Sequence, residues 1–300
     1  MKPAITTRIN RHTGALSGAA SLRTWLAAVC LGILLMVTGC TEKTTAIAPD
    51  DQPVIEAYLA VGQPMMVRVT KQIPFSTDTT GQGKPVEGLS ISISSGGSTY
   101  PLRYVGDGQY QSNPDVKPQV GKTYTMAFDY LGQRVSATTQ IPTKPVNYQQ
   151  DVTELIRTAP GAGGGPGGPG GGILQQLQSA VRLTWQNPTA DYYFVVVDNI
   201  EANPVLINQN VNPNRPLAQN RRFRNQPTQS DFDDVQGLSF QYYGKHRMIL
   251  FHLNPDYAAL YKQSSTSTQN IATPPTTVVN GLGIFTGVNT DTLYVNVKAQ

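Results

Sequence analysis

Two histidines, His246 and His252, are the side chains best suited to acid–base or metal chemistry in this chain of 300 residues. Both fall in or beside a predicted strand over 247–253, and their spacing puts them on one face of that strand. At roughly 3.3 Å per residue they lie ~20 Å apart, too far to share a metal ion whose ligands lie ~2 Å away. One histidine paired with a distant acid would suit a hydrolase, but no Gly-x-Ser-x-Gly motif accompanies it. The sequence therefore predicts no catalytic residue, no metal site and no cofactor.

Three neighbouring acids, Asp231, Asp233 and Asp234, could contribute to calcium binding. A calcium loop of the EF-hand type needs alternating acids, a central glycine and a late glutamate, and this segment lacks that pattern. We therefore interpret these residues as a solvated acidic turn.

Arginines cluster in the same region, which is rich in Asn, Gln and Pro over 203–234 and is predicted to form long loops. Such a basic loop suits a lipid phosphate or an acidic partner, although the acidic turn nearby could simply neutralise it. The arginines in question are Arg215, Arg221, Arg222 and Arg224, of which Arg221, Arg222 and Arg224 form our candidate anion contact.

The N-terminus has the pattern of an export signal. Residues 25–37 form an uncharged apolar run behind a basic stretch, and at ~1.5 Å per residue they span roughly 20 Å, short of a ~30 Å hydrocarbon core. The run ends in VTGC at 37–40, which resembles the bacterial lipobox, whose cysteine receives diacylglycerol. We expect a lipoprotein signal peptide over 1–39, lipid attachment at Cys40 and a lipid-anchored tether over 40–52. An unlipidated secreted protein and an N-terminal membrane anchor are the alternatives.

The formal charge of +4 does not indicate a nucleic-acid-binding protein. The excess of basic residues lies entirely before residue 40, so the rest of the chain is neutral and has no basic footprint. Only 14% of the residues are charged, while Gly (28) and Pro (22) are frequent. This composition disfavours coiled coils and long helices and is typical of short strands joined by turns.

Residues 53–142 are predicted to form an immunoglobulin-like β-sandwich. Apolar and polar side chains alternate over 55–61, 89–94, 123–130 and 135–141, with Gly-containing turns between these segments. Alternation of this kind is typical of half-buried antiparallel strands, and about seven of them suit a sandwich.

Two turns in this domain, DGQY at 107–110 and GKTY at 121–124, resemble the corner turns of immunoglobulin-like and prealbumin-like domains. We expect the hydroxyl groups of Tyr110 and Tyr124 to hydrogen-bond nearby backbone rather than a ligand.

A linker is predicted over 143–172. Residues 151–158 could form two helical turns, and the tract over 161–172 consists almost entirely of Gly and Pro. The tract contains a Gly-x-Gly-x-x-Gly spacing, but it lacks the preceding strand and following helix that a dinucleotide site requires. We expect a flexible loop or linker.

Residues 173–300 are predicted to form a second β-rich domain. Strands over 181–185 and 192–200 are similar to the paired central strands of fibronectin type III modules, with Trp185 in the core. A sugar-binding aromatic platform is less expected than sheet packing for the tyrosines of these strands. Those tyrosines are Tyr192, Tyr193, Tyr242 and Tyr243.

The same domain is predicted to contain one short helix. Asn254, Pro255 and Asp256 are a favourable helix start, with Asn254 as N-cap, and the helix should end near residue 263. Residues 283–288 and 292–297 predict a closing hairpin. The fold class is therefore mostly β, with two antiparallel β-sandwich domains of the immunoglobulin or fibronectin kind.

A specific resemblance rests on several segments in order. After the lipobox Cys40 come GQPMMVRVTKQIPF, DGQY, GKTYTMAFDYLGQRVSATTQIP, NPDYAALYK and NGLGIFTG. Together they resemble the domain of unknown function 4249 family of Bacteroidota outer-membrane lipoproteins, most strongly over 121–142 and 280–287. The resemblance implies an outer-membrane lipoprotein and brings no catalytic residues. Some members of the family are thought to accompany TonB-dependent transporters.

We therefore expect a non-catalytic outer-membrane lipoprotein, anchored through Cys40 on the periplasmic or the cell-surface face. Its expected role is a binding or accessory subunit of a TonB-dependent uptake system, with the transporter as partner and without nucleic acid. A hydrolase of envelope polymers and a structural or adhesive envelope component are the alternatives. An adhesive component would show a flat face rich in Tyr and Asn and no discrete pocket.

Overall fold

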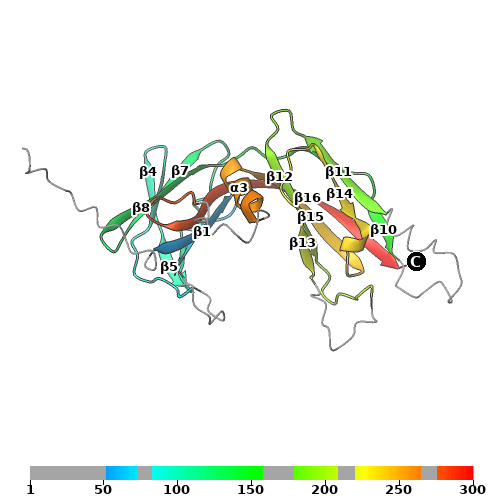
Figure 1. Cartoon of the computed structure of the whole chain (residues 1–300), viewed down its shortest axis with the longest axis horizontal. Helices are drawn as coiled ribbons and strands as arrows, with labels where there is room; N and C mark the ends of the chain where they lie inside the picture. The colour runs from blue at the N-terminus through cyan, green and yellow to red at the C-terminus, as the bar shows by residue number, and fades with distance from the viewer. Residues whose placement is uncertain (1–51, 73–82, 158–178, 209–219, 265–275, 300) are drawn as a thin grey trace, which may run out of the picture. The chain divides into compact units, whose positions relative to one another are not determined.

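Strands dominate the chain, as its alternating pattern predicts (Figure 1). The structure is a computed structural model that describes residues 52–72, 83–157, 179–208, 220–264 and 276–299. The predicted signal peptide, Cys40, Arg215 and the Gly-rich tract lie outside the described residues.

The largest sheet has nine strands. Its order is β13 (Arg222–Arg224), β12 (Tyr192–Asn199), β15 (Gly244–Leu253), β16 (Leu282–Ala299), β1 (Pro53–Ala60), β2 (Met66–Lys71), β6 (Gln109–Gln111) and β5 (Arg103–Gly106), and β10 (Glu154–Arg157) also pairs with β16. A four-stranded sheet has the order β4 (Ser98–Pro101), β3 (Ser92–Ser95), β7 (Thr123–Tyr130), β8 (Gln133–Gln140). A three-stranded sheet has the order β14 (Phe232–Gln236), β11 (Ala180–Gln186), β9 (Val146–Gln150). Helix α3 (Pro255–Ser264) follows β15, and the short 3-10 helix η2 (Gly237–Ser239) precedes β15.

Three apolar clusters lie against the large sheet in the described part of the chain, and the smallest consists of Phe194, Val196, Leu253, Tyr257, Ile284 and Val288. The first buries side chains of β1, β2 and β6 together with those of the four-stranded sheet, such as Leu59, Tyr110 and Phe128. The second buries side chains of β12, β15 and β16 together with those of the three-stranded sheet, and Trp185 lies in it. These cores confirm the predicted mostly β class and the position of Trp185.

The two tyrosine corners are confirmed. The hydroxyl of Tyr110 donates to the carbonyl of Val86 (2.8 Å) and accepts from the amide of Leu89 (3.2 Å). The hydroxyl of Tyr124 accepts from the amide of Gln119 (2.9 Å). Each hydroxyl therefore satisfies backbone groups, which buried polar atoms require.

The predicted closing hairpin is wrong. Residues 282–299 form one strand, β16, whose first half pairs parallel with β1 and whose second half pairs antiparallel with β15. The turn-like residues at its centre have strand partners, since Asn289 faces His252 and Asp291 faces Leu250. The amide of Asn289 also donates to the carbonyl of Pro142 (3.0 Å). Tertiary contacts thus override the local turn preference of these residues.

Two further local predictions are wrong. The segment predicted as two helical turns over 151–158 contains strand β10, because Leu155 enters the second core and Glu154–Arg157 pair parallel with β16. The predicted loop over 203–234 contains strand β13 and the start of β14. Its short polar strands carry little periodicity, and neighbouring strands supply the hydrogen bonds that define them.

Helix α3 begins where the sequence predicts. The amides of Tyr257 and Ala258 donate to the carbonyl of Asn254 (3.1 and 3.3 Å), so Asn254 occupies the N-cap position. The side-chain amide of Asn254 donates to Thr139 and to the carbonyl of Gly287, both outside the helix. The carboxylate of Asp256 instead accepts from the amide of Tyr257 (2.7 Å).

The two segments that carry the strongest family resemblance, 121–142 and 280–287, contact each other. The amide of Gly287 donates to the hydroxyl of Thr139 (2.8 Å). The side-chain amide of Asn254 reaches both segments, with Nδ2 3.0 Å from Thr139 Oγ1 and 3.2 Å from the Gly287 carbonyl oxygen. The contacts indicate that these segments maintain the fold.

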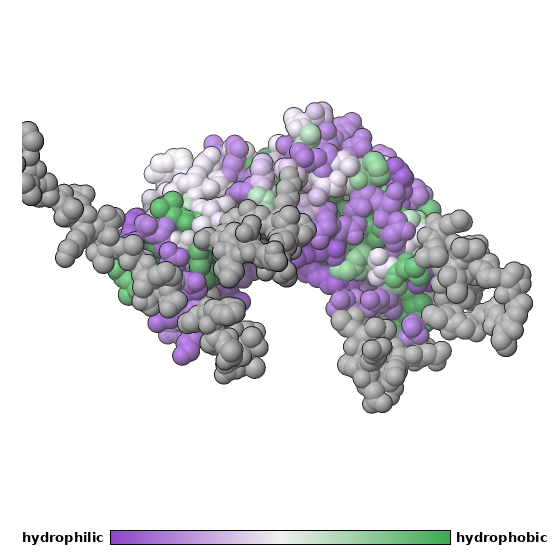
Figure 2. Space-filling model, viewed as in Figure 1, coloured by the Kyte–Doolittle hydropathy of each residue, from purple (hydrophilic) through white to green (hydrophobic). Residues whose placement is uncertain are grey.

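Hydrophilic residues cover most of the described surface on the face seen in Figure 2, and hydrophobic residues occur there in separate patches. Exposed apolar side chains such as Leu131 (65%) and Ile156 (62%) belong to distant parts of the chain. Scattered exposure of this kind is ordinary for a protein surface. Among the described helices, none has the length and apolar character needed to cross a membrane.

Candidate ligand-binding site

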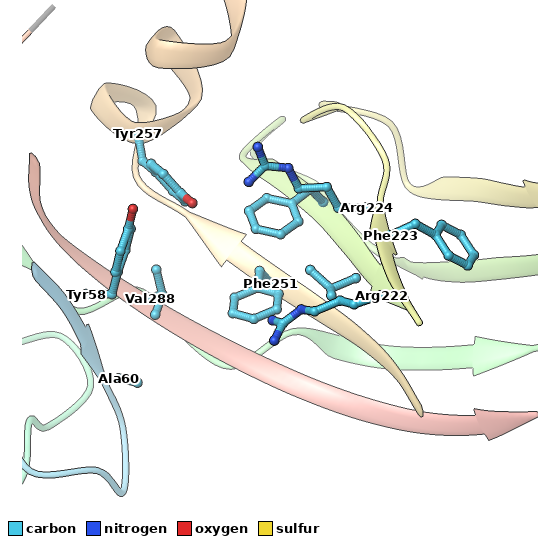
Figure 3. Close-up of a pocket in the computed structure, with 10 residues that line it drawn as sticks. Tyr58, Ala60, Arg222, Phe223, Arg224, Phe251, Tyr257 and Val288 are labelled. Atoms are coloured by element: carbon cyan, nitrogen blue, oxygen red, sulfur yellow. The ribbon is translucent and has the colours of Figure 1, made fainter. Parts of the chain in front are cut away.

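A pocket of about 570 Å³ lies on the outer face of the large sheet, beneath helix α3. Pockets of 300–1,000 Å³ are typical of small-molecule sites. The residues that line it come from β1, β12, β13, β15, β16 and α3 (Figure 3). They are Tyr58, Ala60, Phe194, Val196, Arg222, Phe223, Arg224, Phe251, Tyr257 and Val288.

Strand pairing explains why these residues share one face. The register places Phe194 beside Phe251 and Val196 beside Arg224, and paired residues of neighbouring strands point to the same side of a sheet. Residues Tyr193, Val195 and Val197 of the same strand point into the second core instead. Strand β12 is thus apolar on both faces, because one face contacts the second core and the other adds Phe194 and Val196 to the buried cluster that borders the pocket.

Aromatic rings form the floor and one wall of the pocket. Phe194 and Phe251 are stacked with ring centres 4.9 Å apart. Tyr257 meets Phe194 edge to face at 6.1 Å and Tyr58 at 5.4 Å. Tyr58 is 41% exposed, so part of this aromatic wall is open to solvent.

The structure places the three arginines of the predicted anion contact in two different surroundings. Arg222 and Arg224 point from β13 toward the pocket, opposite Tyr58 and Tyr257 (Figure 3). Arg221 lies elsewhere, since its guanidinium donates to the carbonyls of Asn199 (3.2 Å) and Glu201. Arg221 therefore holds the end of strand β12, whereas Arg222 and Arg224 line the pocket.

The intervening residue, Phe223, borders the pocket, but its ring faces the other side of the sheet. It packs against the second core and meets Phe240 edge to face at 5.6 Å. In Figure 3 its ring points away from the pocket. This alternation places Arg222 and Arg224 on one face of the sheet. A segment predicted to be a loop has no such alternation, so the sequence did not predict this placement.

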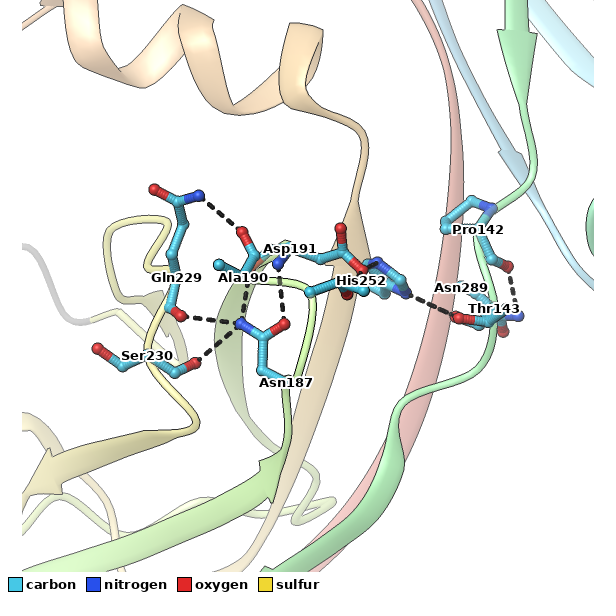
Figure 4. Close-up of polar contacts among 10 residues, drawn as sticks. Pro142, Thr143, Asn187, Ala190, Asp191, Gln229, Ser230, His252 and Asn289 are labelled. Atoms are coloured by element: carbon cyan, nitrogen blue, oxygen red, sulfur yellow. Dashed lines mark hydrogen bonds and ion pairs between the residues drawn. The ribbon is translucent and has the colours of Figure 1, made fainter.

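His252 is buried, and both of its ring nitrogens contact protein groups (Figure 4). Nδ1 donates to the carbonyl of Thr143 (2.8 Å), and Nε2 lies 3.4 Å from the carboxylate of Asp191. The ring also stacks on Tyr193 at 4.6 Å. A general base needs a free nitrogen within reach of substrate, so this geometry favours a structural role.

The carboxylate of Asp191 lies beside His252, one of the two histidines considered for a hydrolase. The loop that carries it is braced by Asn187, whose side-chain oxygen accepts from the amide of Asp191 (2.8 Å). The Asn187 amide donates to the carbonyl of Gln229 (2.8 Å), as Figure 4 shows. These contacts fix the loop that meets His252.

His246 is buried in a network that suits only the neutral ring. Nδ1 donates to the carbonyl of Gly244 (3.0 Å), and Nε2 accepts from the amide of Asn199 (3.2 Å). A proton on Nε2 would face the donor hydrogens of Asn199. Burial lowers the pKa of His246 below its ordinary value of 6.5, and the hydrogen bond to Gly244 opposes that effect.

We expect the stability of the protein to fall as the pH drops below about 6.5, because His246 then binds a proton in the unfolded state and not in the folded state. The slope should approach about 1.4 kcal/mol per pH unit until the folded pKa is reached. Urea unfolding at several pH values measures it. In His246→Asn, which keeps a donor toward Gly244, this share of the slope should vanish, and an unchanged slope would contradict the assignment.

Asp233 and Asp234 of the predicted acidic turn lie in strand β14, and Asp231 immediately precedes that strand. Asp233 accepts from the side-chain amide of Asn225 (2.6 Å), and Asp234 forms an ion pair with Arg182 (3.1 Å). Burial raises the pKa of the Asp233 carboxyl. Within the described ranges, no three His, Cys, Asp or Glu side chains form a group able to hold a metal ion.

Of the tyrosines considered as a sugar platform, Tyr193 and Tyr242 are buried. The aromatic residues that the structure does gather at a pocket are Tyr58, Phe194, Phe251 and Tyr257, which the sequence analysis missed. The sequence pattern could have indicated Tyr58. It is a large aromatic residue on the polar face of its strand, where it does not pack into the core.

Comparisons with known proteins give one family and several distant structures. A family model described as "Domain of unknown function (DUF4249)" matches residues 41–293. No curated protein matches the chain.

The similar solved structures include a segment of two fibronectin type III domains from chicken tenascin, with 11% identity and a TM-score of 0.20, covering 67% of this chain and 91% of that one. The Yersinia pseudotuberculosis adhesin InvE has 11% identity and a TM-score of 0.20, and the match covers 82% of this chain and 58% of that one. A titin fragment has 10% identity and a TM-score of 0.20, covering 83% and 99%. These likenesses carry no argument about function.

Proposed function

This chain belongs to the family described as "Domain of unknown function (DUF4249)", and on that premise we propose a non-catalytic lipoprotein of the bacterial outer membrane. In this proposal Cys40 carries the lipid, and the β-sheet unit binds a small ligand as an accessory subunit of a TonB-dependent uptake system. The family itself assigns no activity, so the proposal depends on the sequence of the N-terminus and on the geometry of the pocket.

The observation that carries the binding role is the pocket on the outer sheet face. It combines an aromatic floor with two arginines, Arg222 and Arg224, and apolar walls with a few polar groups are typical of ligand sites. A structural or adhesive component would need no discrete pocket, so the pocket supports binding over that alternative.

The two histidines support a non-catalytic role over a hydrolase. The ring nitrogens of His246 and His252 all contact neighbouring protein groups. If His252 were catalytic, His252→Gln would abolish release of fragments from isolated cell envelopes. We expect the purified wild-type protein to release none, and release that depends on His252 would overturn the non-catalytic assignment.

The anchor is tested by metabolic labelling with palmitate in cells that express the chain. We expect Cys40→Ala to lose the label, because the thiol is the only nucleophile of the lipobox that accepts diacylglycerol. Cys30→Ala is the matched control, since it removes the other cysteine and should keep the label. Equal labelling of wild type and Cys40→Ala would overturn the anchor.

The transporter partnership is supported by the family resemblance alone. Co-purification from detergent-solubilised outer membranes, with the lipoprotein tagged, should recover a TonB-dependent transporter. Recovery of the lipoprotein by itself, under conditions that keep known transporter complexes intact, would count against an accessory role while leaving the anchor and the pocket to their own tests.

A further inference from the structure

The tip of the β7–β8 hairpin carries a leucine in a conformation that leucine disfavours. Tyr130 pairs with Gln133, so the loop between the two strands consists of Leu131 and Gly132 alone. Leu131 has φ +48° and Gly132 has φ +77°. Two positive φ values are those of a type I′ turn, whose first position normally carries Asn, Asp or Gly. Leucine adopts this region only at a cost in free energy.

The other two-residue hairpin turns of the four-stranded and nine-stranded sheets have the residues that such a turn prefers. The β3–β4 turn is Gly96-Gly97, with φ +55° and +83°, and the β5–β6 turn is Asp107-Gly108, with φ +49° and +72°. Leu131 is also 65% exposed. Exposure alone would be ordinary, but an exposed apolar residue that strains its own turn indicates a use outside the fold.

A second exposed apolar residue, Val279, lies along the same hairpin. It is 59% exposed and pairs with Ser136 of β8, its amide donating to the carbonyl of Ser136 (2.8 Å). The side-chain amide of the next residue, Asn280, donates to the carbonyl of Arg134 (2.8 Å). Ser136 follows Leu131 by five residues, at most about 17 Å of strand. Leu131 and Val279 therefore belong to one end of the four-stranded sheet.

The chain enters strand β1 at this same end. A Cβ on Gly281 would lie 3.1 Å from the carbonyl oxygen of Pro53 and 3.0 Å from the side chain of Val278, so Pro53 lies beside the segment that carries Val279. Thirteen residues, at most about 45 Å of chain, lead from the proposed lipid at Cys40 to Pro53. The opposite end of β1 is a strand length further along, roughly 27 Å. The anchor therefore favours contact with the bilayer through the end at Pro53.

Exposed lysines lie at this end of the strands as well. Lys71 is the register partner of Pro53, and its amide donates to the carbonyl of Lys84 (2.8 Å). The side chain of Arg134 is paired with Asp129 (3.2 Å). Cationic side chains beside exposed apolar ones suit the surface of a bilayer that contains anionic phospholipid.

We propose that Leu131 and Val279 insert into the surface of the bilayer that holds the lipid anchor, so that this end of the four-stranded sheet rests on the membrane. An apolar side chain gains free energy when it leaves water for the boundary of the acyl chains. The tether makes the contact intramolecular, so two small side chains suffice to orient the protein. The inference rests on the proposed anchor and adds the face through which the protein meets the membrane.

The test is quenching of a dye by lipid in the full lipidated protein, held in nanodiscs of phosphatidylcholine and phosphatidylglycerol. The quencher is a phospholipid with a doxyl group near the top of one acyl chain. An introduced cysteine is then the only free thiol, because Cys40 is acylated and Cys30 leaves with the signal peptide. We expect an NBD dye on Leu131→Cys to lose emission when the doxyl lipid is present.

Val61→Cys is the matched control. Val61 is 41% exposed and precedes Gly62 in the turn at the opposite end of β1. A dye at this position should keep its emission in the same nanodiscs, since it is held away from the lipid.

Leu131→Asn separates contact with the membrane from maintenance of the fold. Asparagine is favoured at the first position of a type I′ turn, so the midpoint of urea unfolding should rise. With the dye placed on Val279→Cys, the same substitution should weaken quenching by the doxyl lipid. Val61→Asn removes an apolar side chain at the far end and should leave that quenching unchanged. A purely structural role for Leu131 predicts a lower midpoint and unchanged quenching.

The outcomes distinguish this inference from the anchor on which it rests. Undiminished emission at Leu131→Cys, or equal losses at Leu131→Cys and Val61→Cys, in protein that migrates with the nanodiscs would overturn the inference and leave the anchor in place. A mature chain whose mass shows no lipid would remove the anchor and this inference together.

Discussion

Replacing Gly283 with alanine should destabilise the protein by about 3–5 kcal/mol, a large part of the roughly 5–15 kcal/mol by which native proteins are ordinarily stable. Gly283 has φ +96°, a region that side chains of L-residues rarely adopt. A Cβ at this position would also overlap the carbonyl oxygen of Ile55, its partner on β1. The two strands would have to separate at the pairing that joins the first strand to the last. Urea unfolding followed by Trp fluorescence measures the loss.

Gly132→Ala separates the two costs. Gly132 has φ +77° and open space around its Cβ position, so that variant carries conformational strain without a clash. It should lose only about 1–2 kcal/mol. If both variants lost the same free energy, close approach of β1 and β16 would have no part in the effect.

Replacing Asn254 with aspartate should cost about 2–4 kcal/mol, although the two side chains have the same shape. Nδ2 of Asn254 lies within hydrogen-bond distance of four oxygens, among which its two hydrogens are shared. The oxygens are Thr139 Oγ1 (3.0 Å), the Gln140 carbonyl (2.9 Å), Thr286 Oγ1 (3.4 Å) and the Gly287 carbonyl (3.2 Å). A carboxylate has no donor and would place negative charge among these acceptors. Denaturant unfolding at pH 7 measures the loss.

The aspartate variant keeps the helix start intact, because Asp and Asn are equally good N-cap residues. A loss at Asn254→Asp therefore reports the contacts with 139–140 and 286–287 and not the helix. Asp256→Ala is the comparison, since it removes the carboxylate that accepts from the amide of Tyr257 and should cost about 1 kcal/mol. Asn254→Asp as stable as the wild-type protein would show that these contacts contribute nothing.

The sequence by itself determined the fold class, the first core and the helix start. Period-two alternation requires that one strand face be buried, so residues such as Leu59, Met126 and Phe128 could be assigned to a core before any partner strand was known. The corner at Tyr124 is a local feature, since its partner Gln119 lies five residues earlier. Tyr110 instead bonds Val86 and Leu89, which lie 24 and 21 residues earlier, so that corner was predicted from its turn motif alone.

Tertiary structure decided what local pattern could not. Asn289 lies in a strand because its partner is His252 of β15, and Glu154–Arg157 form a strand because the edge of β16 is open to them. The pocket depends on the same physics. Tyr58 and Arg224 are far apart in sequence, and only the strand order, with β12, β15 and β16 between them, brings their side chains to one face. Pairing between distant strands is set by the global packing, which single-segment periodicity does not contain.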